Sequence, residues 1–208
     1  MKARLLALTA AAIFAGTAPT LPATAQSRAP ASDKAAVDQA SSYLQGLNGA
    51  RGRFVQTDHR GQVTRGTYYL QRPGKLRLEY DAPSRLLIVA DGSKINVSDP
   101  RLKTFNSYPQ GSTPLSLFLG RSIDIDRGAV TSVTRSSSGF AINARDRKNP
   151  RLGYITLSFS GSPVQLREWT VVDGKGQRTR VQLTSMTRAS GFAPSLFRLS
   201  APARQARR

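Results

Sequence analysis

Apolar residues near the start of the chain recur at the spacing of a helix. The repeated positions, three or four residues apart, are Val37, Ala40, Leu44 and Leu47. This spacing predicts an amphipathic helix that begins near Ser32 and ends within 46–49, where two glycines stand. Such a helix has one apolar face, so we expect that face to be buried against another part of the chain.

From residue 51 the spacing changes to two, which is typical of strands with one buried and one solvated face. Leu76, Leu78 and Tyr80 show this most clearly, because they alternate with charged residues. Pairs such as Pro-Gly and Asp-Gly, which favour turns, separate successive segments. The pattern predicts consecutive antiparallel strands at 51–58, 63–72, 75–80, 85–90, 94–98, 129–134, 140–143, 154–159, 165–172 and 178–187, with a last edge strand at 196–199.

The alternation stops between residues 106 and 121. Proline and glycine surround a short apolar run, 115–119, and Thr113 followed by Pro114 resembles the start of a helix. A helix of this length is not stable alone, so we expect it to lie against the sheet as a flap.

The first 25 residues have the three parts of a secretory signal peptide. Lys2 and Arg4 precede an apolar run, and Ala23-Thr24-Ala25 forms a small-residue cleavage site. The mature chain is then expected to begin at Gln26 after export, with a short linker at 26–31. One domain at 32–200 and a basic, disordered tail at 201–208 complete the predicted organisation.

The chain is strongly basic and contains no cysteine. Its formal net charge is +19, from 31 Lys and Arg against 12 Asp and Glu, which favours anionic partners. Export separates the protein from nucleic acid, so these partners are anionic lipid surfaces or acidic protein faces, although a generally arginine-rich composition explains the charge equally well. Without cysteine there is no disulfide framework and no residue for N-terminal lipid attachment.

Candidate chemistry for catalysis is sparse. The only histidine, His59, stands in a predicted turn, and one histidine is too few for a structural zinc site. The two glutamates, Glu79 and Glu168, fit exposed strand positions, and Asp124 and Asp126 fit a surface turn. We therefore expect neither an enzyme nor a bound metal or cofactor.

The strands carry more large apolar side chains than one helix and one flap are expected to cover. Two interpretations stay open at this point: a packed core, or the inner face of a half-open barrel around a cavity. For the second, the candidate lining residues are Phe54, Tyr68, Leu70, Leu76, Leu78, Tyr80, Leu86, Ile88, Leu115, Phe118, Leu157 and Trp169.

Several segments together resemble one family. These are Phe54-Val55-Gln56, Gly66, the run 70–80 with its Arg-Pro-Gly-Lys sequence, Pro83, the run 87–92, Thr113-Pro114-Leu115, 167–169 with 181–183, and 197–202. In order and spacing they resemble the periplasmic outer-membrane lipoprotein carrier proteins of the Lol system. The turns are individually common, so the specificity comes from their combination with the signal peptide and the length. The resemblance covers nearly all of the mature chain.

This resemblance implies a mainly β fold with some α: a strongly curved, incomplete antiparallel β-barrel closed by short helices over an apolar cavity. It implies a soluble, monomeric periplasmic chaperone for triacylated lipoproteins, with an inner-membrane lipoprotein-releasing ABC transporter and an outer-membrane lipoprotein receptor as partners. Arg72 occupies the place of an arginine that holds the lid in this family. The alternatives are a periplasmic carrier or sensor of another lipid, such as a hopanoid, a glycolipid or lipopolysaccharide. The aliphatic lining leaves the preferred cargo open.

Overall fold

The computed structural model describes residues 30–120 and 129–201. The predicted signal peptide, Asp124, Asp126 and nearly all of the predicted basic tail lie outside these residues. The first helix, α1, spans Pro30–Gln45. It therefore begins two residues earlier than the spacing predicts, and the last two residues of the predicted linker belong to it. Proline suits this first position because its missing N–H has no partner at the start of a helix.

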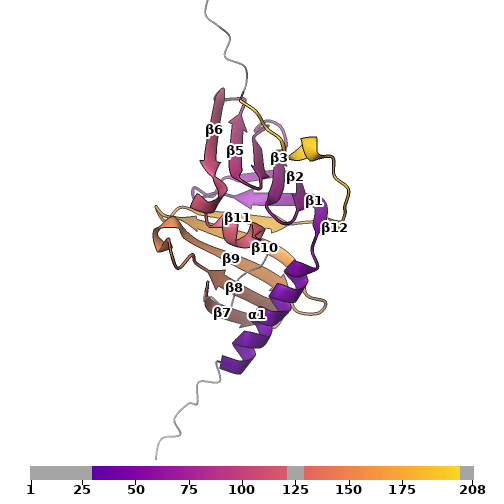
Figure 1. Ribbon diagram of the computed structural model, residues 1–208, viewed down its shortest axis with the longest axis vertical. Coiled ribbons are helices and arrows are strands. Elements are labelled where there is room, and N and C mark those ends of the chain that lie inside the picture. The colour runs from indigo at the N-terminus through magenta and orange to yellow at the C-terminus, as the bar shows by residue number, and fades with distance from the viewer. Residues whose placement is uncertain (1–29, 121–128, 202–208) are drawn as a thin grey trace, which may run out of the picture.

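The strands form a single antiparallel sheet in the order β6-β5-β4-β3-β2-β1-β11-β10-β9-β8-β7, with β12 paired to β1. Within the described ranges β6 and β7 are the two ends of this order and do not pair, so the sheet is open and not a closed barrel. Figure 1 shows that β5 and β6 run in a different direction from β8, β9 and β10, as expected for a strongly twisted sheet. The bounds are β1 Gly49–Thr57, β2 Val63–Gln71, β3 Lys75–Tyr80, β4 Leu87–Asp91, β5 Lys94–Asp99, β6 Thr104–Pro109, β7 Val130–Ser136, β8 Gly139–Ala144, β9 Gly153–Ser160, β10 Gln165–Asp173, β11 Arg178–Leu183 and β12 Thr187–Arg188.

Three elements differ from the sequence prediction. The strand predicted at 178–187 is broken, because β11 ends at Leu183 and a separate strand, β12, pairs with β1 at Thr187–Arg188. β6 was not predicted, because its side chains are nearly all exposed and do not alternate; it forms through its pairing with β5. The last edge strand at 196–199 is wrong, since Pro194–Phe197 forms a 3-10 helix, η3. Phe197 is buried there and meets Phe192 edge to face, with 6.0 Å between ring centroids. This segment packs on β3 and β4, where Arg77 donates a hydrogen bond to the Leu196 carbonyl at 2.9 Å.

Two helices cover the inner face of the sheet. Helix α1 buries its apolar face, including Val37, Ala40 and Leu44, in the same cluster as the inward side chains of the strands. Burying a leucine fully stabilises a fold by about 1.5 to 3 kcal/mol, so this contact supplies the partner that the helix needs. Helix α2, Leu115–Leu119, lies further along the same face and buries Phe118 and Leu119. None of the helices in the described ranges has both the length and the hydropathy needed to span a bilayer.

Local hydrogen bonds hold the short helix α2 in place. A 3-10 turn, η1, at Gln110–Ser112 precedes it, and the Ser116 hydroxyl donates to the Thr113 carbonyl at 2.8 Å. The backbone N–H of Gly74, in the β2–β3 turn, donates to the Leu119 carbonyl at 2.7 Å. The flap predicted from proline and leucine spacing is therefore a one-turn helix attached to the sheet.

Candidate functional site

The predicted lining residues all belong to one hydrophobic cluster on the inner face of the sheet. Leu86, Ile88 and Leu115 are partly exposed at its border, and the others are buried. Strand register explains this arrangement: Leu76, paired with Leu70, shares its face with Leu78, which is paired with Tyr68. Alternation along the strands therefore identified the correct face.

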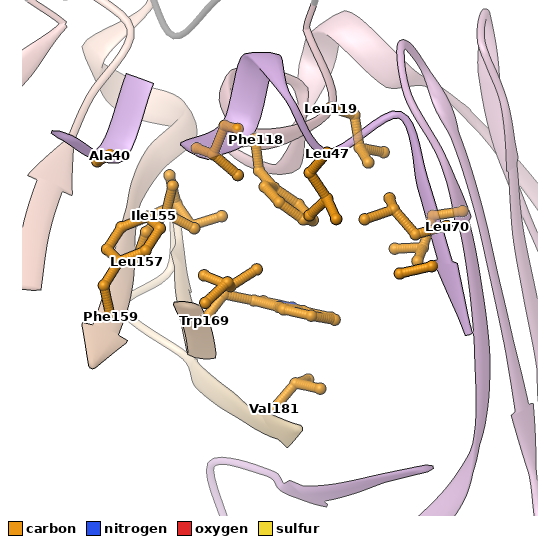
Figure 2. Close-up of a cluster of buried hydrophobic side chains, with 14 of the residues drawn as sticks. Ala40, Leu47, Leu70, Phe118, Leu119, Ile155, Leu157, Phe159, Trp169 and Val181 are labelled. Atoms are coloured by element: carbon orange, nitrogen blue, oxygen red, sulfur yellow. The ribbon is translucent and has the colours of Figure 1, made fainter. Parts of the chain in front are cut away.

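An aromatic pair joins helix α2 to the sheet at the centre of this cluster. The Phe118 ring stacks on the indole of Trp169, with 5.4 Å between centroids and 26° between planes. Figure 2 shows this stack beside Leu47, with Leu157 on the neighbouring strand. Trp169 is the only tryptophan of the chain, and it lies on β10 opposite Val181 of β11.

Within 30–120 and 129–201, side chains of the covering segments occupy the apolar face where a cavity was predicted. Ala40 of α1, Leu47 shortly after α1 and Phe118 of α2 belong to the same cluster as the strand residues, each at 0% exposure. This arrangement corresponds to the packed-core interpretation, and the space would open only if a helix moved away. The part of these side chains in ligand binding therefore stays a prediction.

Arg72 connects the ends of both covering helices. Its Nη1 donates to the carbonyl of Leu44, in the last turn of α1, and its Nη2 donates to the carbonyl of Gly120, directly after α2, at 2.7 Å. The resemblance implied that Arg72 holds the lid; its acceptor there is the carbonyl of Gly120, one residue after α2, and the contact to α1 was not predicted. One guanidinium thus bridges two elements about 70 residues apart in sequence.

The electrostatics of Arg72 depend on these two contacts. The side chain is buried, and the loss of solvent lowers the pKa of its guanidinium. Carbonyl groups at the carboxyl ends of helices carry partial negative charge, so they offset part of this cost. The remaining nitrogen, Nε, has no hydrogen-bond partner within 30–120 and 129–201. Both Nη atoms of Arg72 therefore have partners, and its Nε has none. Arg72 is the only buried charged residue in the described parts of the chain.

The residue that sequence reasoning missed is Leu44, which acts through its carbonyl. The spacing of Leu44 indicated that its side chain is buried, but nothing in the sequence indicated that its carbonyl accepts a hydrogen bond. The nearest sequence signal is the end of the helix at Gly46, because helix ends leave carbonyl groups without internal partners. Arg188 donates to the Gly46 carbonyl at 2.8 Å from the exposed side of the same helix end.

The groups considered for catalysis do not come together. His59 is exposed in the β1–β2 turn. Glu79 pairs with Arg77, and Glu168 pairs with Arg180, each at 2.6 Å. Across the described ranges, no three His, Cys, Asp or Glu side chains gather as metal ligands would.

Comparison with known proteins assigns this arrangement to a family. The model of the family described as "Outer membrane lipoprotein carrier protein LolA" matches residues 45–200. The chain belongs to the LolA family. The match begins at the last residue of α1 and covers all the strands and α2. Arg72, its acceptor Gly120 and the strand residues of the cluster therefore lie within the LolA region, and Leu44 directly precedes it.

Individual relatives agree with the LolA assignment. An outer-membrane lipoprotein carrier protein of Methylobacillus flagellatus is 31% identical over 178 residues, covering 80% of this chain and 85% of the relative. That of Dechloromonas aromatica is 30% identical, covering 81% and 85%. Among solved structures, a LolA superfamily protein from Nitrosomonas europaea aligns with a TM-score of 0.44 and 8% identity, covering 80% of this chain and 97% of that one.

Proposed function

We propose that this LolA-family chain is a soluble periplasmic carrier that shields the acyl chains of lipoproteins from water. The observation that supports it best is the apolar inner face of an open sheet, covered by two helices whose ends are joined by one buried arginine. The names of its relatives agree with this role. The site acts by binding and release, without a chemical step.

The size of the hydrophobic effect explains why a carrier is needed. Burying an acyl chain contributes about 0.8 kcal/mol per methylene, so a chain of roughly 15 methylenes gains on the order of 12 kcal/mol on leaving water. Unassisted crossing of the periplasm is therefore negligible. A carrier must recover most of this free energy and still release its cargo.

The covering helices provide the means of release. In the closed state, Phe118 and Leu119 occupy the apolar face that an acyl chain would contact. Cargo must displace α2 and break the Arg72 contacts, and reclosure recovers those interactions when cargo leaves. The stability of the closed state thereby lowers the apparent affinity for cargo. Opening the two helices would turn the curved sheet into the incomplete barrel with a cavity.

The finer parts of the proposal follow from the family resemblance. We place the carrier, as a monomer, between an inner-membrane lipoprotein-releasing ABC transporter and an outer-membrane lipoprotein receptor. The absence of cysteine agrees with a chain that is not itself lipid-anchored. Triacylated lipoproteins are the proposed cargo.

Trp169 allows a direct test of this proposal. Purified mature protein is titrated with a synthetic triacylated lipopeptide while tryptophan emission is recorded; separation of Phe118 from the indole should change the emission in a saturable way. The same peptide without acyl chains is the control and should have no effect. A hopanoid, a glycolipid and lipopolysaccharide are tested as competitors. Failure of the lipopeptide to bind, or tighter binding of one of these lipids, would overturn lipoprotein as the cargo.

A further inference from the structure

The face of the sheet opposite the hydrophobic cluster contains a polar pocket of about 390 Å³ over β7 to β11. Register places it on this outer face: Thr170 lines the pocket, while its neighbours Trp169 and Val171 point into the cluster or pack against it. Thr156, paired with Thr170, alternates in the same way with Ile155 and Leu157. The pocket is therefore separate from the site described above.

A row of hydroxyl and amide groups forms one part of the pocket wall. Asn143, Thr156 and Thr170 are neighbours across β8, β9 and β10. The Thr156 hydroxyl donates a hydrogen bond to Asn143 Oδ1, and Asn143 Nδ2 donates to the Ser132 hydroxyl at 2.7 Å. Thr170 differs, because only 3% of its surface is exposed and its hydroxyl has no side-chain hydrogen bond with any described residue. This hydroxyl does not belong to the fully buried polar atoms without a partner in the described ranges, so it keeps access to the pocket and can bond to a molecule there.

The adjacent row places an arginine at each end of an apolar floor. Tyr154 is paired with Val172, and Val172 is paired with Arg178. At the other end the Arg145 guanidinium lies over the Tyr154 ring, 5.6 Å from its centroid. Within the described ranges neither arginine forms an ion pair, and the pocket lining includes no carboxylate. The pocket consequently carries two uncompensated positive charges.

The carboxylates close to this pocket in sequence have other partners. Asp146 accepts backbone hydrogen bonds in the turn after β8, and Asp173 does the same in the β10–β11 turn. Glu168 is paired with Arg180. Each aspartate accepts these bonds through Oδ1, and none of the three acidic groups forms an ion pair with Arg145 or Arg178 in the described ranges.

We propose that this pocket binds the phosphate group of a small polar molecule. Arg145 and Arg178 provide planar donors that match phosphate oxygens, and Thr170 provides a further hydroxyl donor. The volume lies at the small end of the range for ligand sites, and the polar wall does not suit an acyl chain. The phosphate belongs either to a lipid headgroup or to a free phosphorylated polyol. This inference does not rest on the carrier function.

Two probes distinguish these sources. Free glycerol 3-phosphate is titrated by calorimetry, and vesicles of phosphatidylcholine with and without phosphatidylglycerol are tested by cosedimentation. Arg145→Gln and Arg178→Gln should each weaken binding by about 10-fold or more, since each removes a charged donor. Thr170→Val keeps the shape, removes one hydroxyl, and should weaken binding less. Arg60→Gln, in the exposed β1–β2 turn, is the control with the same loss of charge and should leave binding unchanged.

Either probe supports the proposal if its binding depends on the pocket arginines. Loss of glycerol 3-phosphate binding in the variants assigns a free ligand, and loss of vesicle binding alone assigns a lipid headgroup. The proposal is overturned if the wild-type protein binds neither probe, or if Arg60→Gln weakens binding as much as the pocket variants. Thermal unfolding of each variant establishes that it is folded. The Trp169 titration with lipopeptide should be the same in all of them, so failure here is distinct from failure of the carrier function.

Discussion

Replacing Arg72 with leucine removes the two hydrogen bonds by which its guanidinium holds the ends of α1 and α2. A hydrogen bond to a charged group contributes about 1.5 to 3 kcal/mol, so the gross loss from two bonds is about 3 to 6 kcal/mol. Part of this is recovered, because leucine does not carry the cost of burying a charged guanidinium, the same loss of solvent that lowers the pKa of Arg72. We expect a net loss of about 2 to 3 kcal/mol from the closed state.

The loaded state does not suffer the same loss. In our proposal cargo has already displaced α2, so the Arg72 contacts are broken in that state, and leucine adds apolar surface to the wall. The equilibrium therefore shifts toward retention by about 30- to 140-fold, since each 1.4 kcal/mol corresponds to a factor of ten. Arg72→Leu should accept lipoprotein but release it slowly.

The assay separates the two steps. Loading from inner-membrane vesicles is measured first, and transfer from the purified complex to the receptor is measured second. Arg72→Lys should release cargo at an intermediate rate, because an ammonium keeps the charge but lacks the planar fork that bridges two carbonyls. Arg188→Leu is the matched control: it removes one exposed bond at the end of α1 and no contact with α2, so release should stay near the wild-type rate.

One result would refute the proposed role of Arg72 in holding the covering helices closed. If Arg72→Leu is folded, loads, and unloads at the wild-type rate, the bonds to Leu44 and Gly120 do not drive the reclosure that releases cargo. Arg72 would then be a structural residue that completes two helix ends. Equal slowing in Arg188→Leu would also contradict the reasoning, since it would assign the effect to α1 alone.

Three further predictions concern export, docking and pH. Intact-mass analysis of protein from the periplasm should show a chain that begins at Gln26 without a fatty-acid adduct; an uncut or acylated chain would contradict the assignment of residues 1–25. Transfer rates should fall as salt rises, because salt screens the basic exterior over about 10 Å at 0.1 M. A rate that does not change with salt would show that charge does not contribute to docking. Burial raises the pKa of both Tyr68 and Tyr80 above the ordinary tyrosine value. Below about pH 10 the folded and unfolded chains both keep these tyrosine protons. Above that pH the unfolded chain loses them first, so the stability of the folded protein to urea should decline at alkaline pH. Tyr80→Phe should reduce that decline, and an unchanged pH profile in this variant would show that Tyr80 does not contribute.

Local sequence patterns were enough to predict most elements of the fold. Alternation placed β3 at the residues where the structure has it and put Leu76, Leu78 and Tyr80 on the buried face. Proline and leucine spacing located α2, and the three-and-four spacing located α1. These predictions succeeded because the period of side-chain directions, two in a strand and 3.6 in a helix, is a property of the local backbone.

Features that depend on contacts between elements could not be predicted in this way. β6 exists because β5 offers it a pairing edge, and 194–197 turns into a 3-10 helix because Phe197 packs on the outside of the sheet. Whether the apolar face encloses a cavity or a packed core depends on where α1 and α2 come to lie, which no local pattern encodes. The pairing of Arg72 with Leu44 is of the same kind, since a carbonyl is present in every residue and only the tertiary fold selects which one meets the guanidinium.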